Sequence, residues 1–372
     1  MKVLNNYNEC LTNLACSIRK YFKLDYKHNT LEYIDKILEE KKPKNVVVLL
    51  FDGMGFIFLK KYLDNNDFLN KHLYKDITTV FPATTVAATT SMMTGLNPSE
   101  TAMLGWNMYY KDLDKIITTF RNTIKNTNIL SEDAINYKNK YMITKTIMDE
   151  INEKGKYKGY TLFPFGDNPY KDRNDLCNII ENLCNNNDKK YIYAYDVEPD
   201  NTMHDFGCDA ECIKKDIKEI NNLVEKLSKK LKDTIIFVLA DHGHINVENI
   251  FINDYKDIIE CLKKDTSLEQ RTINFHIKED KIEIFKELFN KYFSDYFDLY
   301  TVNEVIESKL FGDGEENIIF KDILGDYIAI AKSNKALVSK GEYELVSTHA
   351  GYTKDEIMVP LIIIDTDKIK DI

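Results

Sequence analysis

The chain has 372 residues, of which 44% are hydrophobic and 30% charged, and its formal net charge is −10. This length holds one large domain or two ordinary ones, and the acidic balance argues against a nucleic-acid scaffold, which needs a basic surface. No segment approaches the roughly 18 apolar residues that a membrane span needs, so we expect no membrane partner.

Helices and strands are predicted to alternate along most of the chain. Apolar residues recur at intervals of three and four over residues 7–22 and 30–42, which predicts two helices that end before Pro43. The continuous apolar run at residues 45–51 predicts a strand covered on both faces. Further strands are expected at residues 76–81, 159–165, 190–197, 234–240 and 359–365, and further helices at residues 56–66, 86–95, 141–155, 174–186 and 210–232.

This alternation predicts an α/β fold with a mostly parallel central sheet flanked by helices. We expect residues 1–43 to form an N-terminal helical segment that packs on the core. The core itself is expected to comprise residues 44–253 and 341–372. Residues 254–340 are charged and rich in helical patterns, and they interrupt the apolar strand pattern of the core. We interpret them as an inserted, smaller α+β cap.

The predicted strands deliver carboxylates, imidazoles and hydroxyls at their carboxyl ends, where ligands bind in open α/β sheets. In chain order these residues are Asp52, Thr84 and Thr85, Asp200 and His204, Asp241 and His242, and His349. Each has a simpler interpretation alone, since an Asp suits a turn, a Thr suits a helix cap and a lone His suits the surface. Their joint occurrence at the strand ends favours one common site.

More than four carboxylate and imidazole ligands, without thiolates, indicate two divalent metal ions rather than one structural zinc. Two ions about 4 Å apart hold the attacking and leaving oxygens of a phosphoryl transfer. A threonine hydroxyl bound to one ion at a helix N-terminus would become a nucleophile, and such a terminus favours an anionic substrate. The pattern therefore predicts a metal-dependent phosphoryl-transfer site.

Five motifs that contain these residues resemble the alkaline phosphatase superfamily, in its type I phosphodiesterase / nucleotide pyrophosphatase branch. The motifs are VLLFDGMG, FPATTVAATTSMMTGLNPSE, EPDNTMHDFG, LADHGH and STHAGYTKDEIMVPLIII, and they follow the order of the family. They span roughly residues 44–250 and 340–366. Each motif is weak alone, whereas all five in order are specific. The resemblance implies an alkaline-phosphatase-like fold and two metal ions, usually zinc and in some branches manganese.

The resemblance also implies a role for each matching residue. The ligands of one ion match Asp52, Thr85, Asp241 and His242, and those of the other match Asp200, His204 and His349. Thr85 also matches the nucleophile, although the adjacent Thr84 keeps this assignment open. Where family members place an asparagine to hold a phosphate oxygen, this chain has Trp106, with Asn107 one residue further on. Both are candidate substrate-binding residues, and Trp106 is a candidate for stacking on a nucleobase.

The expected activity is that of a phosphodiesterase / nucleotide pyrophosphatase, which acts on a small phosphorylated substrate such as a nucleotide through a phospho-threonine intermediate. The segment at residues 86–95 carries no Arg or Lys to neutralise a monoester dianion, which favours diesters. A phosphomonoesterase, a phosphonate hydrolase or a phosphomutase on the same site is the alternative. A catalytically inactive binding protein is the remote alternative, and it is disfavoured because no ligand is missing.

Three further features complete the interpretation. His244 is interpreted as a supporting residue rather than a ligand, and Arg271, in the cap, is a candidate for contact with the substrate. The seven cysteines are an odd number scattered along the chain, which does not suit a disulfide framework. We therefore expect a cytoplasmic location.

Overall fold

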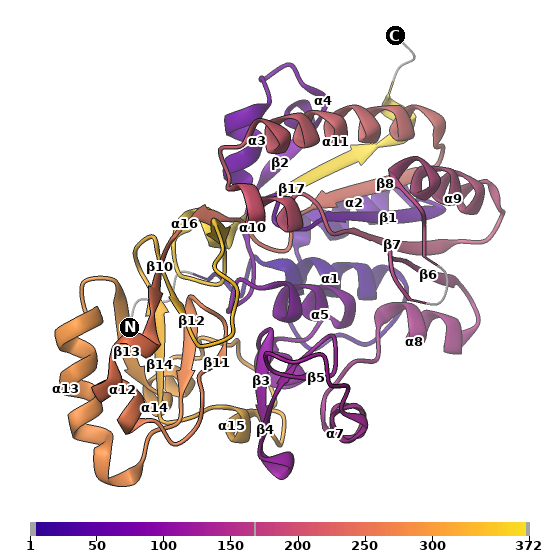
Figure 1. Cartoon of the computed structure of the whole chain (residues 1–372). Helices are drawn as coiled ribbons and strands as arrows, with labels where there is room; N and C mark the ends of the chain where they lie inside the picture. The colour runs from indigo at the N-terminus through magenta and orange to yellow at the C-terminus, as the bar shows by residue number, and fades with distance from the viewer. Residues whose placement is uncertain (1–4, 167–168, 370–372) are drawn as a thin grey trace.

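The computed structural model describes residues 5–166 and 169–369, and its central sheet has six strands in the order β2-β17-β8-β1-β7-β6 (Figure 1). These strands are β1 (Asn45–Phe51), β2 (Leu73–Thr78), β6 (Lys158–Leu162), β7 (Lys190–Asp196), β8 (Thr234–Leu239) and β17 (Met358–Asp365). β1, β6, β7 and β8 run parallel, whereas β17 is antiparallel to β8 and β2. The sheet is therefore mixed, and the expected α/β class with a mostly parallel sheet is confirmed.

Helices cover both faces of this sheet, as the continuous apolar runs predicted. Every residue of β1, β7 and β8 is buried. Figure 1 shows α1 (Leu11–Tyr21), α5 (Thr85–Thr94) and α8 (Ile147–Lys154) on one side, and α3 (Phe56–Tyr62), α9 (Arg173–Asn185) and α11 (Glu211–Lys230) on the other. Further out, α2 (Glu32–Lys41) packs on α1, and α4 (Phe68–Lys71) packs on α11. A sheet packed in this way is a rigid support for the residues at its strand ends.

A second sheet has seven strands in the order β13-β14-β12-β11-β3-β4-β5, and all its paired neighbours are antiparallel. Its strands are β3 (Asn107–Tyr110), β4 (Lys115–Thr118), β5 (Thr123–Ile124), β11 (Ser267–Leu268), β12 (Thr272–Phe275), β13 (Phe297–Thr301) and β14 (Tyr327–Ala331). The helices around it are α6 (Pro98–Thr101), α7 (Glu132–Tyr141), α12 (Lys256–Cys261), α13 (Ile282–Phe293), α14 (Val302–Glu307) and α15 (Phe320–Ile323).

The second sheet draws on more of the chain than the cap expected at residues 254–340. That segment supplies β11 to β14, whereas β3 to β5 come from residues 107–124, which lie within the expected core segment 44–253. Local periodicity cannot reveal this, because the link between the two segments is a pairing of Leu268 with Asn107 across a long sequence separation. The division of the chain into domains stays a prediction. Residues 107–124 share a sheet with strands of the expected cap.

The remaining elements are short. They are α10 (Asp200–Phe206), α16 (Lys354–Ile357), the strand pairs β9 (Ile245–Asn246) with β16 (Ser347–Thr348) and β10 (Glu248–Phe251) with β15 (Lys335–Val338), and the 3-10 turns η1 (Lys111–Leu113), η2 (Ile252–Asp254), η3 (Glu279–Lys281) and η4 (Thr366–Lys368). Within the described residues, none of the helices combines the length and the apolar character needed to cross a membrane.

Candidate functional site: a carboxylate and imidazole cluster at the strand ends

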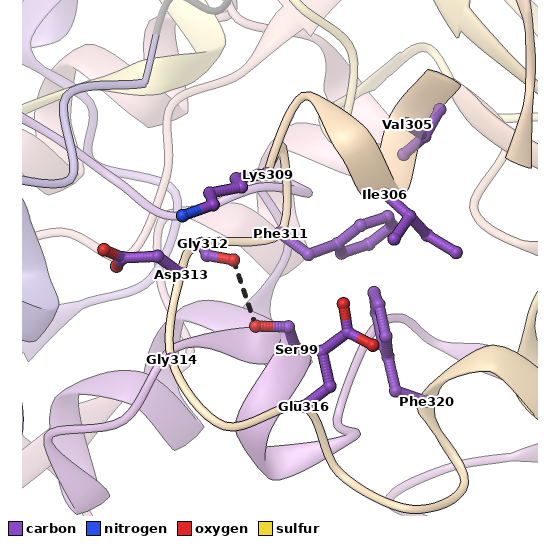
Figure 2. A pocket seen from close by; sticks show the side chains of 10 residues that line it. All are labelled: Ser99, Val305, Ile306, Lys309, Phe311, Gly312, Asp313, Gly314, Glu316 and Phe320. Atoms are coloured by element: carbon purple, nitrogen blue, oxygen red, sulfur yellow. Dashed lines mark hydrogen bonds between the residues drawn. The ribbon is translucent and has the colours of Figure 1, made fainter. Parts of the chain in front are cut away.

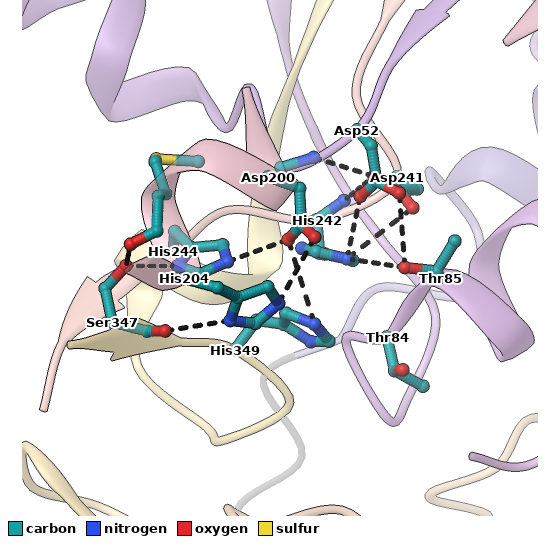
Figure 3. A network of polar contacts seen from close by, with 12 residues as sticks. Asp52, Thr84, Thr85, Asp200, His204, Asp241, His242, His244, Ser347 and His349 are labelled. Atoms are coloured by element: carbon teal, nitrogen blue, oxygen red, sulfur yellow. Dashed lines mark hydrogen bonds and ion pairs between the residues drawn. The ribbon is translucent and has the colours of Figure 1, made fainter. Parts of the chain in front are cut away.

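The residues expected at the strand ends meet in one cluster (Figure 3). Asp52 follows β1, Asp241 and His242 follow β8, and Asp200 and His204 lie on α10, directly after β7. His349 comes from the loop after β16, and Thr85 is the first residue of α5. The parallel directions of β1, β7 and β8 bring their carboxyl ends to the same edge of the sheet, which is why positions far apart in sequence converge.

One half of the cluster surrounds the Thr85 hydroxyl. Thr85 Oγ1 lies 3.3 Å from Asp52 Oδ2 and 3.2 Å from His242 Nε2. His242 Nε2 also lies 3.2 Å from Asp52 Oδ1 and 3.5 Å from Asp241 Oδ2. Tyr195, on β7, donates its hydroxyl proton to Asp52 Oδ2. This half thus contains the four residues that the resemblance assigns to one metal ion.

The other half surrounds the Asp200 carboxylate. His204 Nε2 lies 3.2 Å from Asp200 Oδ2, and His349 Nε2 lies 3.9 Å from Asp200 Oδ1. A third imidazole, His244, approaches Asp200 Oδ1 at 2.7 Å through its Nε2. One atom each from Asp200, His204, His244 and His349 can be chosen so that all lie within 4.8 Å of one another.

His244 is the residue of this cluster that sequence reasoning left out of the ligand set. A usable signal was present, because His242 and His244 are two positions apart in a segment without helical structure, and alternate side chains of an extended chain point to the same side. The ring of His244 is buried, and its exposed fraction is 2%. The structure therefore adds a fourth imidazole to the three that were expected.

A backbone carbonyl fixes the remote nitrogen of three of the four imidazoles. Nδ1 of His204 donates to the Ser347 carbonyl at 2.9 Å, that of His242 to the Gly243 carbonyl at 3.1 Å, and that of His349 to the Ala83 carbonyl at 3.0 Å. With a proton on Nδ1, the neutral ring presents its Nε2 lone pair to the carboxylates. Outer hydrogen bonds of this kind are what orient histidines for metal binding.

The electrostatics of the carboxylates call for added positive charge. Burial raises the pKa of Asp52 and Asp241 well above the ordinary range, and a second carboxylate nearby, Asp200 or Asp52 respectively, raises each further. Burial also opposes ionisation of Asp200, but the charges of His204 and His244 outweigh it and hold the pKa of Asp200 low. Among the described residues, Asp52 Oδ1 and Asp241 Oδ2 accept no hydrogen bond. Divalent cations would satisfy these oxygens and the facing lone pairs, so the donor set fits metal ions.

The two neighbouring threonines face different partners. Thr84, and not Thr85, is the N-cap residue of α5. The Oγ1 of Thr84 donates to Glu269 at 2.6 Å. Figure 3 shows the Thr85 hydroxyl directed at Asp52 and His242, with Thr84 to one side. The geometry therefore favours Thr85 over Thr84 as the residue next to the metal ligands.

The candidate substrate-binding residues are held by the second sheet. Trp106 donates its backbone N–H to Glu269 at 2.7 Å, and its ring packs edge-on against Phe120. Asn107 belongs to β3, and its Oδ1 accepts from Thr118 at 2.9 Å. Their contact with a substrate stays a prediction.

Arg271 does not face the cluster. It is fully buried and forms a bidentate ion pair with Glu356, with its Nε 2.7 Å from Oε1 and its Nη2 2.9 Å from Oε2. Two further guanidinium hydrogens go to the carbonyls of Ser333 and Lys335, so four of the five are in use. The candidate contact of Arg271 with a substrate is therefore replaced by a structural role, because most of its donors are already in use.

A small cavity of about 60 Å³ lies elsewhere, between α6, α14 and the segment that follows α14 (Figure 2). Val305, Phe311 and Phe320 form its apolar lining, and Ser99 Oγ donates to the Gly312 carbonyl at its edge. It contains none of the strand-end residues. The cavity is thus separate from the cluster and has room for little more than solvent.

Comparisons with known proteins agree with this geometry. The profile of the type I phosphodiesterase / nucleotide pyrophosphatase family matches residues 46–353. The structure is similar to murine ectonucleotide pyrophosphatase / phosphodiesterase 5, in an inactive form in complex with AMP, with a TM-score of 0.65 and 17% identity over 85% of this chain and 87% of that one. It is also similar to the human counterpart, with a TM-score of 0.66 and 16% identity over 86% and 87% of the two chains. No curated protein matches the chain in sequence.

The family that matches residues 46–353 comprises phosphodiesterases and nucleotide pyrophosphatases, which are hydrolases of phosphoric esters. The chain belongs to the type I phosphodiesterase / nucleotide pyrophosphatase family.

Proposed function

We propose that the protein is a two-metal phosphodiesterase or nucleotide pyrophosphatase that acts through a covalent phospho-threonine at Thr85. The observation that carries this proposal is the position of Thr85 Oγ1, which lies 3.3 Å from Asp52 and 3.2 Å from His242 at the N-terminus of a ten-residue helix. A hydroxyl placed between candidate metal ligands and a helix N-terminus suits attack on an anionic phosphoryl group.

The ligand sets follow the two halves of the cluster. Asp52, Thr85, Asp241 and His242 would hold one ion, and Asp200, His204 and His349 would hold the other, with His244 as a further ligand. Oxygen and imidazole donors suit zinc first, and manganese second. Two such ions would polarise the phosphoryl oxygens and make the threonine hydroxyl acidic.

The residues of the chain then divide the work. Thr85 Oγ forms a bond to phosphorus in line as its proton passes to solvent, and the bond from phosphorus to the leaving-group oxygen breaks on the opposite side. The free backbone N–H groups of the first turn of α5 face the phosphoryl oxygens. Tyr195 holds Asp52 by a hydrogen bond from its hydroxyl, which fixes that carboxylate beside Thr85. Water finally hydrolyses the phospho-threonine and restores the hydroxyl.

The surroundings of Thr85 support a phosphodiester or pyrophosphate, such as a small nucleotide, as the substrate. The sequence of α5 contains no Lys or Arg, and Arg271 is engaged by Glu356. A monoester dianion would therefore find little positive charge beyond the metal ions. The murine relative is in complex with AMP, which supports a substrate that contains a nucleotide.

Turnover of p-nitrophenyl thymidine 5'-monophosphate by zinc- or manganese-loaded protein tests this proposal. We expect the wild type to hydrolyse this diester and Thr85→Ala to lose activity by about 10³-fold or more, because the nucleophile is gone. Thr90→Ala, on the same helix but outside the cluster, is the matched control and should stay active. A fully active Thr85→Ala variant would contradict the assignment of the nucleophile, and turnover of a simple monoester alone would contradict the substrate class.

A further inference from the structure

A carboxylate from the second sheet reaches the mouth of the cluster. Glu269 lies in the turn between β11 and β12, and its Oε1 accepts two hydrogen bonds. One comes from Thr84 Oγ1 at 2.6 Å and the other from the Trp106 backbone N–H at 2.7 Å. Because Thr84 precedes Thr85 in the chain, Glu269 stands next to the proposed nucleophile.

The backbone around Glu269 is shaped for this approach. Leu268 has a φ of 70°, which is costly for a non-glycine residue, and its side chain is buried. A Cβ added at Gly105 would lie 3.2 Å from the Leu268 Cα and 3.4 Å from Glu269 Oε1, so only glycine leaves full room for the carboxylate. A strained residue and a close backbone contact together hold Glu269 in one position.

The charge of Glu269 is not neutralised by a neighbouring cation. Among the described residues, no Lys or Arg forms an ion pair with it, and both of its hydrogen-bond donors are neutral groups. Burial raises its pKa to about 7. The hydrogen bonds from Thr84 and Trp106 and the charge of His242 lower the pKa, whereas the charge of Glu342 raises it. At a pH above this value the carboxylate is ionised, and its hydrogen bond to Thr84 places it one residue from Thr85.

We propose that Glu269 is a specificity-determining residue that disfavours phosphomonoester dianions at this site. This inference rests on the proposed function, since it concerns the phosphoryl group that Thr85 would attack. A monoester carries one more negative charge than a diester near neutral pH, and the repulsion between like charges acts more strongly on the monoester. Glu269 also occupies the Thr84 hydroxyl and the Trp106 N–H, so neither donor is free to bind a phosphoryl oxygen.

The test separates the charge of Glu269 from its hydrogen bonds. Glu269→Gln keeps an acceptor for Thr84 and Trp106 and removes the charge. We expect kcat/KM at pH 8 to rise for both anionic substrates, and to rise about tenfold more for p-nitrophenyl phosphate than for bis-p-nitrophenyl phosphate, with Tm nearly unchanged. Glu248→Gln removes a carboxylate of β10 that pairs with Lys335, and as the control it should leave the ratio unchanged.

A binding measurement makes the test independent of turnover. Titration of inorganic phosphate into zinc-loaded Thr85→Ala and Thr85→Ala/Glu269→Gln proteins should show about tenfold tighter binding to the second. An unchanged substrate ratio together with unchanged phosphate affinity would overturn the proposal and leave Glu269 as a link between the two sheets. Absence of diester turnover in the wild type would instead count against the proposed function, and the phosphate titration would still decide the role of Glu269.

Discussion

At the scale of single residues, the site depends on how each imidazole is held. Ser347 is the clearest case, because its Oγ lies 2.6 Å from the Met203 carbonyl and 3.0 Å from His244 Nδ1. A hydroxyl has one proton, and the carbonyl must take it, so Ser347 accepts from His244 Nδ1. In its neutral form the His244 ring then directs its Nε2 lone pair at Asp200 Oδ1, 2.7 Å away, and a metal ion bound by both atoms would offset their repulsion.

This reasoning predicts the effect of removing the Ser347 hydroxyl. In Ser347→Ala the Nδ1 acceptor is lost and His244 is free to change its tautomer, so zinc affinity should fall about 10- to 100-fold. Competition with a chromophoric chelator measures this affinity. Ser228→Ala is the matched control, because that buried serine bonds only within its own helix α11, to the Val224 carbonyl. Equal zinc affinities of wild type and Ser347→Ala would remove His244 from the ligand set.

At the scale of the elements, close backbone contacts place the ligands. A Cβ added at Gly243 would lie 1.9 Å from the Asp355 carbonyl oxygen. Only glycine therefore fits at position 243, where the backbone after His242 contacts α16. The same helix α16 carries Glu356, whose carboxylate clamps Arg271 at the start of β12. The loop between β16 and α16, which contains His349, is thus tied to both the first sheet and the second.

The Arg271 and Glu356 pair gives a stability prediction with a defined pH dependence. Burial works against the Glu356 carboxylate, but the charge and hydrogen bonds of Arg271 outweigh it and lower its pKa. Glu356→Gln leaves a buried guanidinium unpaired and should cost about 3–5 kcal/mol of unfolding free energy at pH 7.

Because the folded pKa of Glu356 is depressed, its contribution is complete above the unfolded pKa of about 4.3 and is lost as the pH falls through the folded pKa. Urea unfolding of the metal-free proteins between pH 7 and pH 3 should therefore show a difference between wild type and Glu356→Gln that is constant at first and then shrinks in acid. Glu248→Gln, at an exposed ion pair, should leave the free energy of unfolding nearly unchanged over this range. A difference that grows in acid would contradict this account.

At the scale of the whole molecule, the sequence revealed the first sheet and its strand-end residues but not the second sheet. Continuous apolar runs such as residues 45–51 and 234–239 identify buried strands, and parallel strands must bring their ends together. The pairing of β3 with β11 has no local signature, because short strands of an antiparallel sheet are defined by their partners. Glu269 was missed for the same reason, since its position depends on that pairing. His244 was missed although its spacing from His242 was visible.

The cluster joins segments from most of the length of the chain, from Asp52 to His349. We propose that it holds two divalent ions. The most direct test is native mass spectrometry of the zinc-loaded protein, which counts bound ions per chain. We predict two ions for the wild type and one for His204→Ala, because His204 belongs to one of the two candidate ligand groups and not to the other. A wild-type protein that binds no more than one ion under saturating zinc would contradict the account.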